Sequence, residues 1–197
     1  MPSETDLLND SLSQIGANRI TGIDDGSVNA NHCLTLYPSL RKALLRSHHW
    51  NFAEHRAELA QNVTPPLFEF SFSYTLPSDS LKVKEYNGSS LDTTNLTLFD
   101  VLERFKIEGR NLFTNDGEVK IVYIQDITDP NVWDPLFYQV LASWLASKLA
   151  MAITKNVEMS RSLLEDAVNI LLPFAVAVDG QEGTITPFRS DDLIMGR

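Results

Sequence analysis

The feature that most constrains the fold is a change of hydrophobic period partway along the chain. From Leu67 to Leu76, apolar and polar residues alternate, which is typical of a strand with one buried face. A second strand is predicted at Leu81–Tyr86. Phe105–Phe113 and Val119–Ile124 flank Thr114–Gly117, whose Asn-Asp-Gly sequence suits a hairpin turn between two paired strands.

On both sides of this region, apolar residues recur every three or four positions, as on one face of a helix. A first helix is predicted from the N-cap Ser3 to Gly16, and a second over Val28–Ser47, which Pro38 should kink or divide. Asp129-Pro130 is expected to open the most apolar helix. A further helix is predicted over about Lys155–Leu172, kinked or ended by Pro173.

These patterns predict an α+β fold, a helical bundle that carries an inserted small antiparallel β subdomain. The predicted division is a helical part at 1–66, a β subdomain at 67–127, bundle-completing helices at 128–178 and an extended C-terminal arm at 179–197. The order of the strands is left open by the sequence. A chain of 197 residues is the size of one domain with a small subdomain.

The net charge and the cysteine content limit the classes of function that this chain can have. The formal net charge of −10 argues against a surface that grips nucleic acid, because such a surface neutralises phosphates with Lys and Arg. The single cysteine, Cys33, allows no intramolecular disulfide and fits a reducing compartment. The most apolar stretch, Val132–Ile153, contains Asp134 and Lys148, so it is predicted to be a buried helix and not a membrane span.

The stretch Arg46–Arg56 holds three of the four histidines with Trp50 and Phe52 between them. Histidine invites a catalytic or metal-binding interpretation. We favour a structural one, in which Trp50 and Phe52 anchor a helix end in the core and the histidines cap carbonyls of the last helical turn.

Metal and nucleophile chemistry both fit the sequence poorly. His48 and His49 are adjacent, so they point to different sides of a helix or strand. The other possible ligands are His32, Cys33 and His55, and the sequence contains no Cys-x-x-Cys or His-x-x-x-His pair that could begin a metal site. A Cys33–histidine pair lacks a third orienting group, and we expect Cys33 to be a small core residue. No phosphate-binding glycine pattern is present. We therefore predict no catalytic residue, no metal and no cofactor.

Several segments, taken in order, resemble the tail tubular protein A family, the head-to-tail adaptors of short-tailed, podovirus-type bacteriophages. Leu36–Ala53 is similar to the family's arginine–histidine–proline–tryptophan–asparagine–phenylalanine helix end, with His49 in the usual proline position. The resemblance covers nearly the whole chain, and its other segments are Leu8–Ser27, Tyr74–Val83, Asn111–Asp116, Val122–Ile124 and Asp129-Pro130.

The resemblance implies a structural virion protein of the tail or neck, assembled in the host cytoplasm. It implies a twelve-copy ring between the portal protein and the tail nozzle, which would be a protein like tail tubular protein B. DNA would pass through the lumen of the ring without specific binding. No contact of the protein with a membrane is expected. The arm, with Phe188, Leu193, Ile194 and Arg197, would dock on the portal. The predicted hairpin, with Phe113, Asn115 and Asp116, would face the nozzle or a neighbouring subunit.

Two alternatives stay open at this point. One is a stopper or head-completion connector with six copies in place of twelve. The other is a hydrolase that uses the histidines and Cys33.

Overall fold

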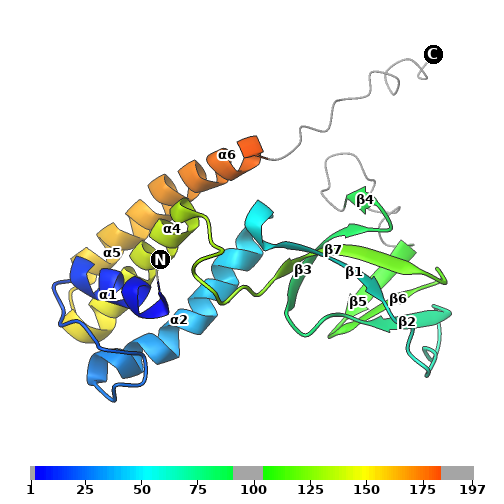
Figure 1. Cartoon of the computed structure of the whole chain (residues 1–197), viewed down its shortest axis with the longest axis horizontal. Coiled ribbons are helices and arrows are strands. Elements are labelled where there is room, and N and C mark those ends of the chain that lie inside the picture. Colours follow the sequence, from blue (N-terminus) through cyan, green and yellow to red (C-terminus); the bar gives the residue numbers. More distant parts are fainter. Residues whose placement is uncertain (1–2, 91–103, 183–197) are drawn as a thin grey trace, which may run out of the picture.

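The computed structural model describes residues 3–90 and 104–182. Its helices gather at one end of an elongated molecule and its strands at the other (Figure 1). The predicted α+β class is confirmed.

The first two helices begin at the caps that the sequence predicts. Helix α1 (Glu4–Gln14) opens with a capping box, in which the Ser3 hydroxyl accepts from Asp6 N at 3.1 Å and the Asp6 carboxylate accepts from Ser3 N at 2.9 Å. Gly16, with φ of +69°, follows its end. Helix α2 (Val28–Ser47) includes Pro38 without being divided. The carbonyl that loses its N–H partner to Pro38 belongs to Leu34, four positions earlier, and Leu34 lies on the exposed side of the helix.

Helix α4 (Pro135–Leu149) is the centre of the bundle. It begins later than predicted, because Asp134 and not Asp129 is its N-cap. The Asp134 carboxylate accepts the N–H groups of Leu136 (2.7 Å) and Phe137 (3.2 Å), and Pro135 takes the first helical position, where no N–H is needed.

One helical stretch of the described chain, Pro135–Thr154, is long and apolar enough to cross a membrane by length and composition. It comprises α4 and the π-helical turn η2 (Ala150–Thr154). The α4 part contacts α1, α2, α5 and α6, and its apolar residues belong to the helical core. Its position in the bundle accounts for its composition.

The last helices form one continuous rod from Val157 to Glu182, made of α5 (Val157–Asp166), the π-helical turn η3 (Ala167–Leu171) and α6 (Leu172–Glu182). The prediction that the arm begins at residue 179 is therefore wrong, and Pro173 does not end the helix. The wider η3 turn ends two positions before Pro173 and relieves the clash that a proline makes with the preceding turn of a regular α-helix.

The strands form two antiparallel sheets. The first has the order β1-β7-β3-β4 and the second β2-β6-β5. Their bounds are β1 Glu54–Leu59, β2 Phe72–Thr75, β3 Ser80–Tyr86, β4 Ser89–Ser90, β5 Phe105–Glu108, β6 Asn111–Thr114 and β7 Val119–Gln125.

The structure corrects three details of the predicted β subdomain. Strand β1 lies inside the predicted helical part, because an edge strand with a charged outer face carries little apolar signal. The predicted strand from Leu67 shrinks to β2, since Glu69 is left-handed, with φ of +72°, and turns the chain away from the sheet. The two-residue hairpin is at Gly109-Arg110, between β5 and β6, where Gly109 has φ of +60°.

The predicted Thr114–Gly117 turn consequently joins two different sheets, since β6 pairs with β2 and β5 whereas β7 pairs with β1 and β3. The prediction that it closes a hairpin is wrong. Its Asp116 instead accepts hydrogen bonds from both sheets.

Two apolar cores result, and β7 takes part in both. Tyr123 belongs to the core between the sheets, whereas its neighbour Ile124 belongs to the helical core. A buried ion pair adds to this junction. The Arg41 guanidinium of α2 donates to the Asp126 carboxylate at 2.9 to 3.2 Å, directly after β7.

Candidate functional site

The stretch Arg46–Arg56 is the joint between the bundle and the sheets. Helix α2 ends at Ser47, the turn η1 (Asn51–Ala53) follows, and β1 begins at Glu54. Trp50 is fully buried, and its indole N–H donates to the Leu44 carbonyl at 3.0 Å. Its ring meets Phe137 of α4 edge to face at 5.1 Å. Trp50 thus fastens the end of α2 to the central helix.

Phe52 occupies the edge of the same aromatic group. It is half-buried, and its ring lies 5.0 Å from Phe137 and 6.0 Å from Trp50. The two aromatics of the joint therefore pack on one α4 residue, Trp50 from directly before the short turn η1 and Phe52 from within it.

The histidine of this joint with the clearest partner does not cap a carbonyl, contrary to the prediction. His48 Nε2 lies 3.1 Å from Asp179 Oδ2 on α6. Asp179 Oδ1 accepts from Asn51 N at 3.1 Å, and the Asp179 carbonyl accepts from Asn51 Nδ2 at 2.6 Å. We call His48, Asn51 and Asp179 the α6 clasp. It ties the joint to the last turns of a helix far along the chain.

The remaining histidines and the cysteine do not gather into a reactive site. His55 lies on β1, with its ring 6.1 Å from that of Tyr123. Cys33 and His48 are fifteen positions apart along α2, which is about 22 Å at the rise of an α-helix. Residues 3–90 and 104–182 contain no group of three metal-ligating side chains. Cys33 and His48 are therefore too far apart to act as a nucleophile and its base.

Burial also makes Cys33 a poor nucleophile, because it raises the pKa of the thiol to about 11. We expect Ellman's reagent at pH 8 to label the native protein far more slowly than the same protein unfolded in guanidinium chloride. The absorbance of the coloured thiolate that the reagent releases measures the rate of labelling. Equally fast labelling of both forms would mean that Cys33 is accessible.

The residues predicted to form a hairpin toward the nozzle have structural partners. Tyr86 of β3 donates to Asp116 Oδ2 at 2.6 Å, and Tyr74 of β2 donates to the Asp116 carbonyl at 3.0 Å. Asn115 Oδ1 accepts from Ser71 N at 2.9 Å. Asp116 thus joins the two sheets, and burial raises the pKa of Tyr86. Phe113 lines a groove beside the loop 62–71.

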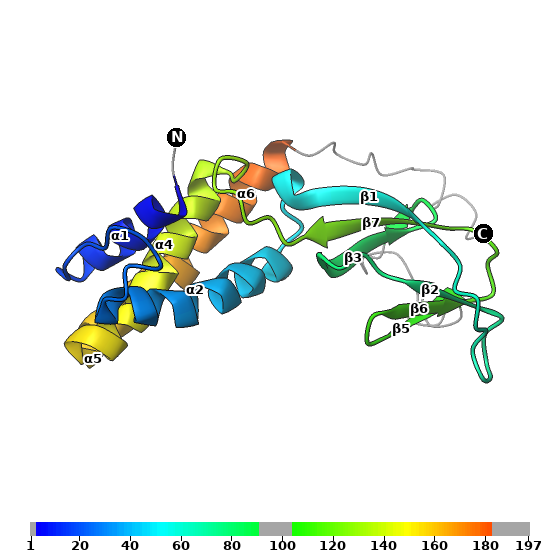
Figure 2. The same cartoon turned by 60° about the horizontal axis from the view of Figure 1, so that its bottom comes forward.

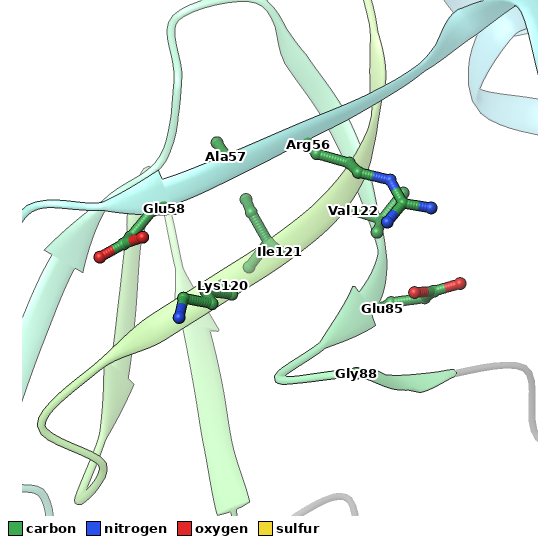
Figure 3. Close-up of a pocket in the computed structure, with 8 residues that line it drawn as sticks. All are labelled: Arg56, Ala57, Glu58, Glu85, Gly88, Lys120, Ile121 and Val122. Carbon is green, nitrogen blue, oxygen red and sulfur yellow. The ribbon is translucent and has the colours of Figure 1, made fainter.

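A shallow hollow of about 390 Å³ lies over the first sheet. Figure 3 shows Arg56 and Glu85 beside Val122 at one end, and Glu58 and Lys120 at the other. Glu58 and Lys120 are opposite one another in the β1–β7 register. The hollow is open, and its charges of both signs are spread over β1, β3 and β7, which is the chemistry of a solvated sheet surface and not of an enclosed reactive pocket.

Exposed apolar side chains are the stronger functional signal. Ile170 and Phe174, which are 62% and 58% exposed, lie on the rod α5–η3–α6. Val28 and Leu34 are exposed on α2. The loop 62–71 exposes Val63, Leu67 and Phe68.

The sequence interpretation missed these surfaces. The further helix was predicted over about Lys155–Leu172, with Pro173 kinking or ending it, and Phe68 was assigned to a predicted strand. A continuation of the helical period to Glu182 would have been the signal for Phe174. The residues predicted to dock on the portal, Phe188, Leu193, Ile194 and Arg197, lie outside the described residues.

The chain matches no protein-family model and no curated protein sequence.

Proposed function

We propose that this protein is the head-to-tail adaptor of a short-tailed bacteriophage, a structural subunit that forms a ring between the portal and the tail nozzle. The observation that carries the proposal is the segment Leu36–Ala53, the most specific of the family-like motifs. It lies at the joint where α2, β1 and α6 meet, so the residues that resemble the family are those on which this architecture depends.

Two further observations support a structural role. The net charge of −10 would limit the adhesion of DNA to a lumen that it has to pass. Exposed apolar residues on both α2 and the C-terminal rod suit a subunit that is surrounded by protein. In this proposal the residues after Glu182 contact the portal, and the sheet end of the molecule faces the nozzle or neighbouring subunits.

Mixing the purified chain with its portal tests the proposal. Negative-stain images should show rings of the chain seated on the portal, and averaged top views should count twelve copies rather than the six of a stopper. A chain that stays monomeric both alone and with the portal would contradict the adaptor function.

The portal contact has its own test. Truncation after Glu182 preserves the α6 clasp, so the shortened chain should fold with an unchanged melting temperature. We expect it to lose binding to the portal in a pull-down, because Phe188, Leu193, Ile194 and Arg197 are removed. Full binding by the truncated chain would contradict docking through the arm.

A further inference from the structure

The bundle has two helical surfaces on opposite sides of α4. Helix α4 contacts α2 on one side and α5, η3 and α6 on the other. Figures 1 and 2 both place α4 between α2 and the C-terminal rod. A subunit that contacts two neighbours in a ring through unlike patches needs such opposed surfaces.

Both surfaces carry apolar residues that are exposed in the part of the chain that the structure describes. On the C-terminal rod, Ile170 and Phe174 are four positions apart and so share one face. On α2, Val28 is 70% exposed and Leu34 is 48% exposed. Exposed apolar area of this kind on both sides is what a protein-protein contact would bury.

The charges of the two surfaces are opposite in sign. Helix α2 contains Arg41, Lys42 and Arg46 and no acidic residue. Arg41 is buried on Asp126, which Lys42 also approaches at 3.5 Å, and both Lys42 and Arg46 are exposed. The C-terminal rod exposes four acidic residues and one basic residue, and these are Glu158, Glu165, Asp166, Glu182 and Arg161.

This difference matters because copies of a chain with a net charge of −10 repel one another. An acidic surface of one copy is best met by a surface without carboxylates, and α2 provides one. Two copies of the acidic rod, in contrast, would face like charges across a symmetric contact.

We propose that neighbouring copies pack head to tail, with the exposed face of α2 in one copy against the exposed face of α5–η3–α6 in the next. The inference rests on the proposed function, since it identifies the surfaces that close the proposed ring. The occupant of each surface is a second copy of this chain.

Substitutions at Leu34 test the charge assignment with a matched pair. Leu34→Glu places a carboxylate against the acidic rod of the neighbour, whereas Leu34→Lys removes the same apolar side chain but keeps the attraction. Mass photometry of the full chain, alone and with portal, should show rings lost in L34E and better retained in L34K. Equal loss in the two variants, or greater loss in L34K, would overturn the assignment.

The other surface is tested by the double variant Ile170→Glu/Phe174→Glu, which should also be monomeric. Val132→Glu is the control, because Val132 is 49% exposed but lies on neither surface. We expect V132E to form rings like the wild type. Loss of rings in V132E would mean that ring loss is not specific to substitutions on the two proposed surfaces, and it would contradict the proposal.

A mixing experiment distinguishes a head-to-tail contact from misfolding. L34E keeps an intact rod surface and I170E/F174E keeps an intact α2 surface, so a 1:1 mixture should form a dimer that does not grow. Misfolded variants, or a symmetric contact through a single surface, would give no such capped dimer, and its absence would overturn the proposal. Rings that persist in both variants would refute these surfaces while leaving the adaptor function in place. A wild type that is monomeric even with portal would refute both.

Discussion

Replacement of Trp50 by Ala is expected to lower the free energy of unfolding by about 3–5 kcal/mol. Trp50 is fully buried, contacts Phe137 and Phe52, and donates its indole N–H to the Leu44 carbonyl. The substitution leaves a cavity where α2 meets α4, and it also leaves that carbonyl without its side-chain donor. Guanidinium chloride denaturation followed by far-UV circular dichroism measures the change.

Two variants serve as comparisons. Trp50→Phe keeps most of the buried ring but not the indole N–H, so its cost should be smaller than that of Trp50→Ala. Phe68→Ala removes an aromatic ring that is 77% exposed and should change stability by less than about 0.5 kcal/mol. If W50A and F68A had similar costs, the anchoring role of Trp50 would be refuted.

Replacement of Asp126 by Ala is expected to cost about 3–5 kcal/mol, because it leaves the buried Arg41 guanidinium without its counter-ion. The side chains of Arg41 and Asp126 are only 7% and 15% exposed. Removing both charges avoids the unpaired ion, so the double variant Arg41→Met/Asp126→Ala should cost less than D126A alone. Denaturant midpoints of the three proteins give the comparison.

Lys42 provides the matched control for this pair. It also lies near Asp126, at 3.5 Å, but its side chain is 54% exposed. Exposed ion pairs contribute little, so Lys42→Ala should cost less than about 1 kcal/mol. A cost for K42A that equals the cost for D126A would show that Arg41 is not the principal partner.

The helices were the most predictable part of the fold. Ser3, Gly16 and the bounds of α2 follow from local capping and periodicity, which the sequence displays directly. The start of α4 was harder, because Asp129-Pro130 and Asp134-Pro135 offer the same local signal. Only the packed structure distinguishes them, through the position of Trp133 and Phe137 in the core.

The pairing of the strands could not be predicted, because it depends on contacts between distant segments. The alternation from Leu67 to Leu76 predicted one long strand. In the structure the left-handed backbone of Glu69 interrupts this segment, and only Phe72–Thr75 forms a strand. The same holds for the candidate site. The sequence placed Trp50 and Phe52 at a helix end, but nothing local identified Asp179 as the partner of His48 across 131 positions.

The junction between the two ends of the molecule has a mechanical consequence. Both chain connections between bundle and sheets run side by side, and they are paired from the first residue of β1, where Glu54 is opposite Ile124. Bending there would strain a backbone ladder, the Arg41–Asp126 pair and the aromatic contacts of Trp50 together. The junction should therefore resist bending, so that the helical end and the sheet end of the described chain keep a constant separation.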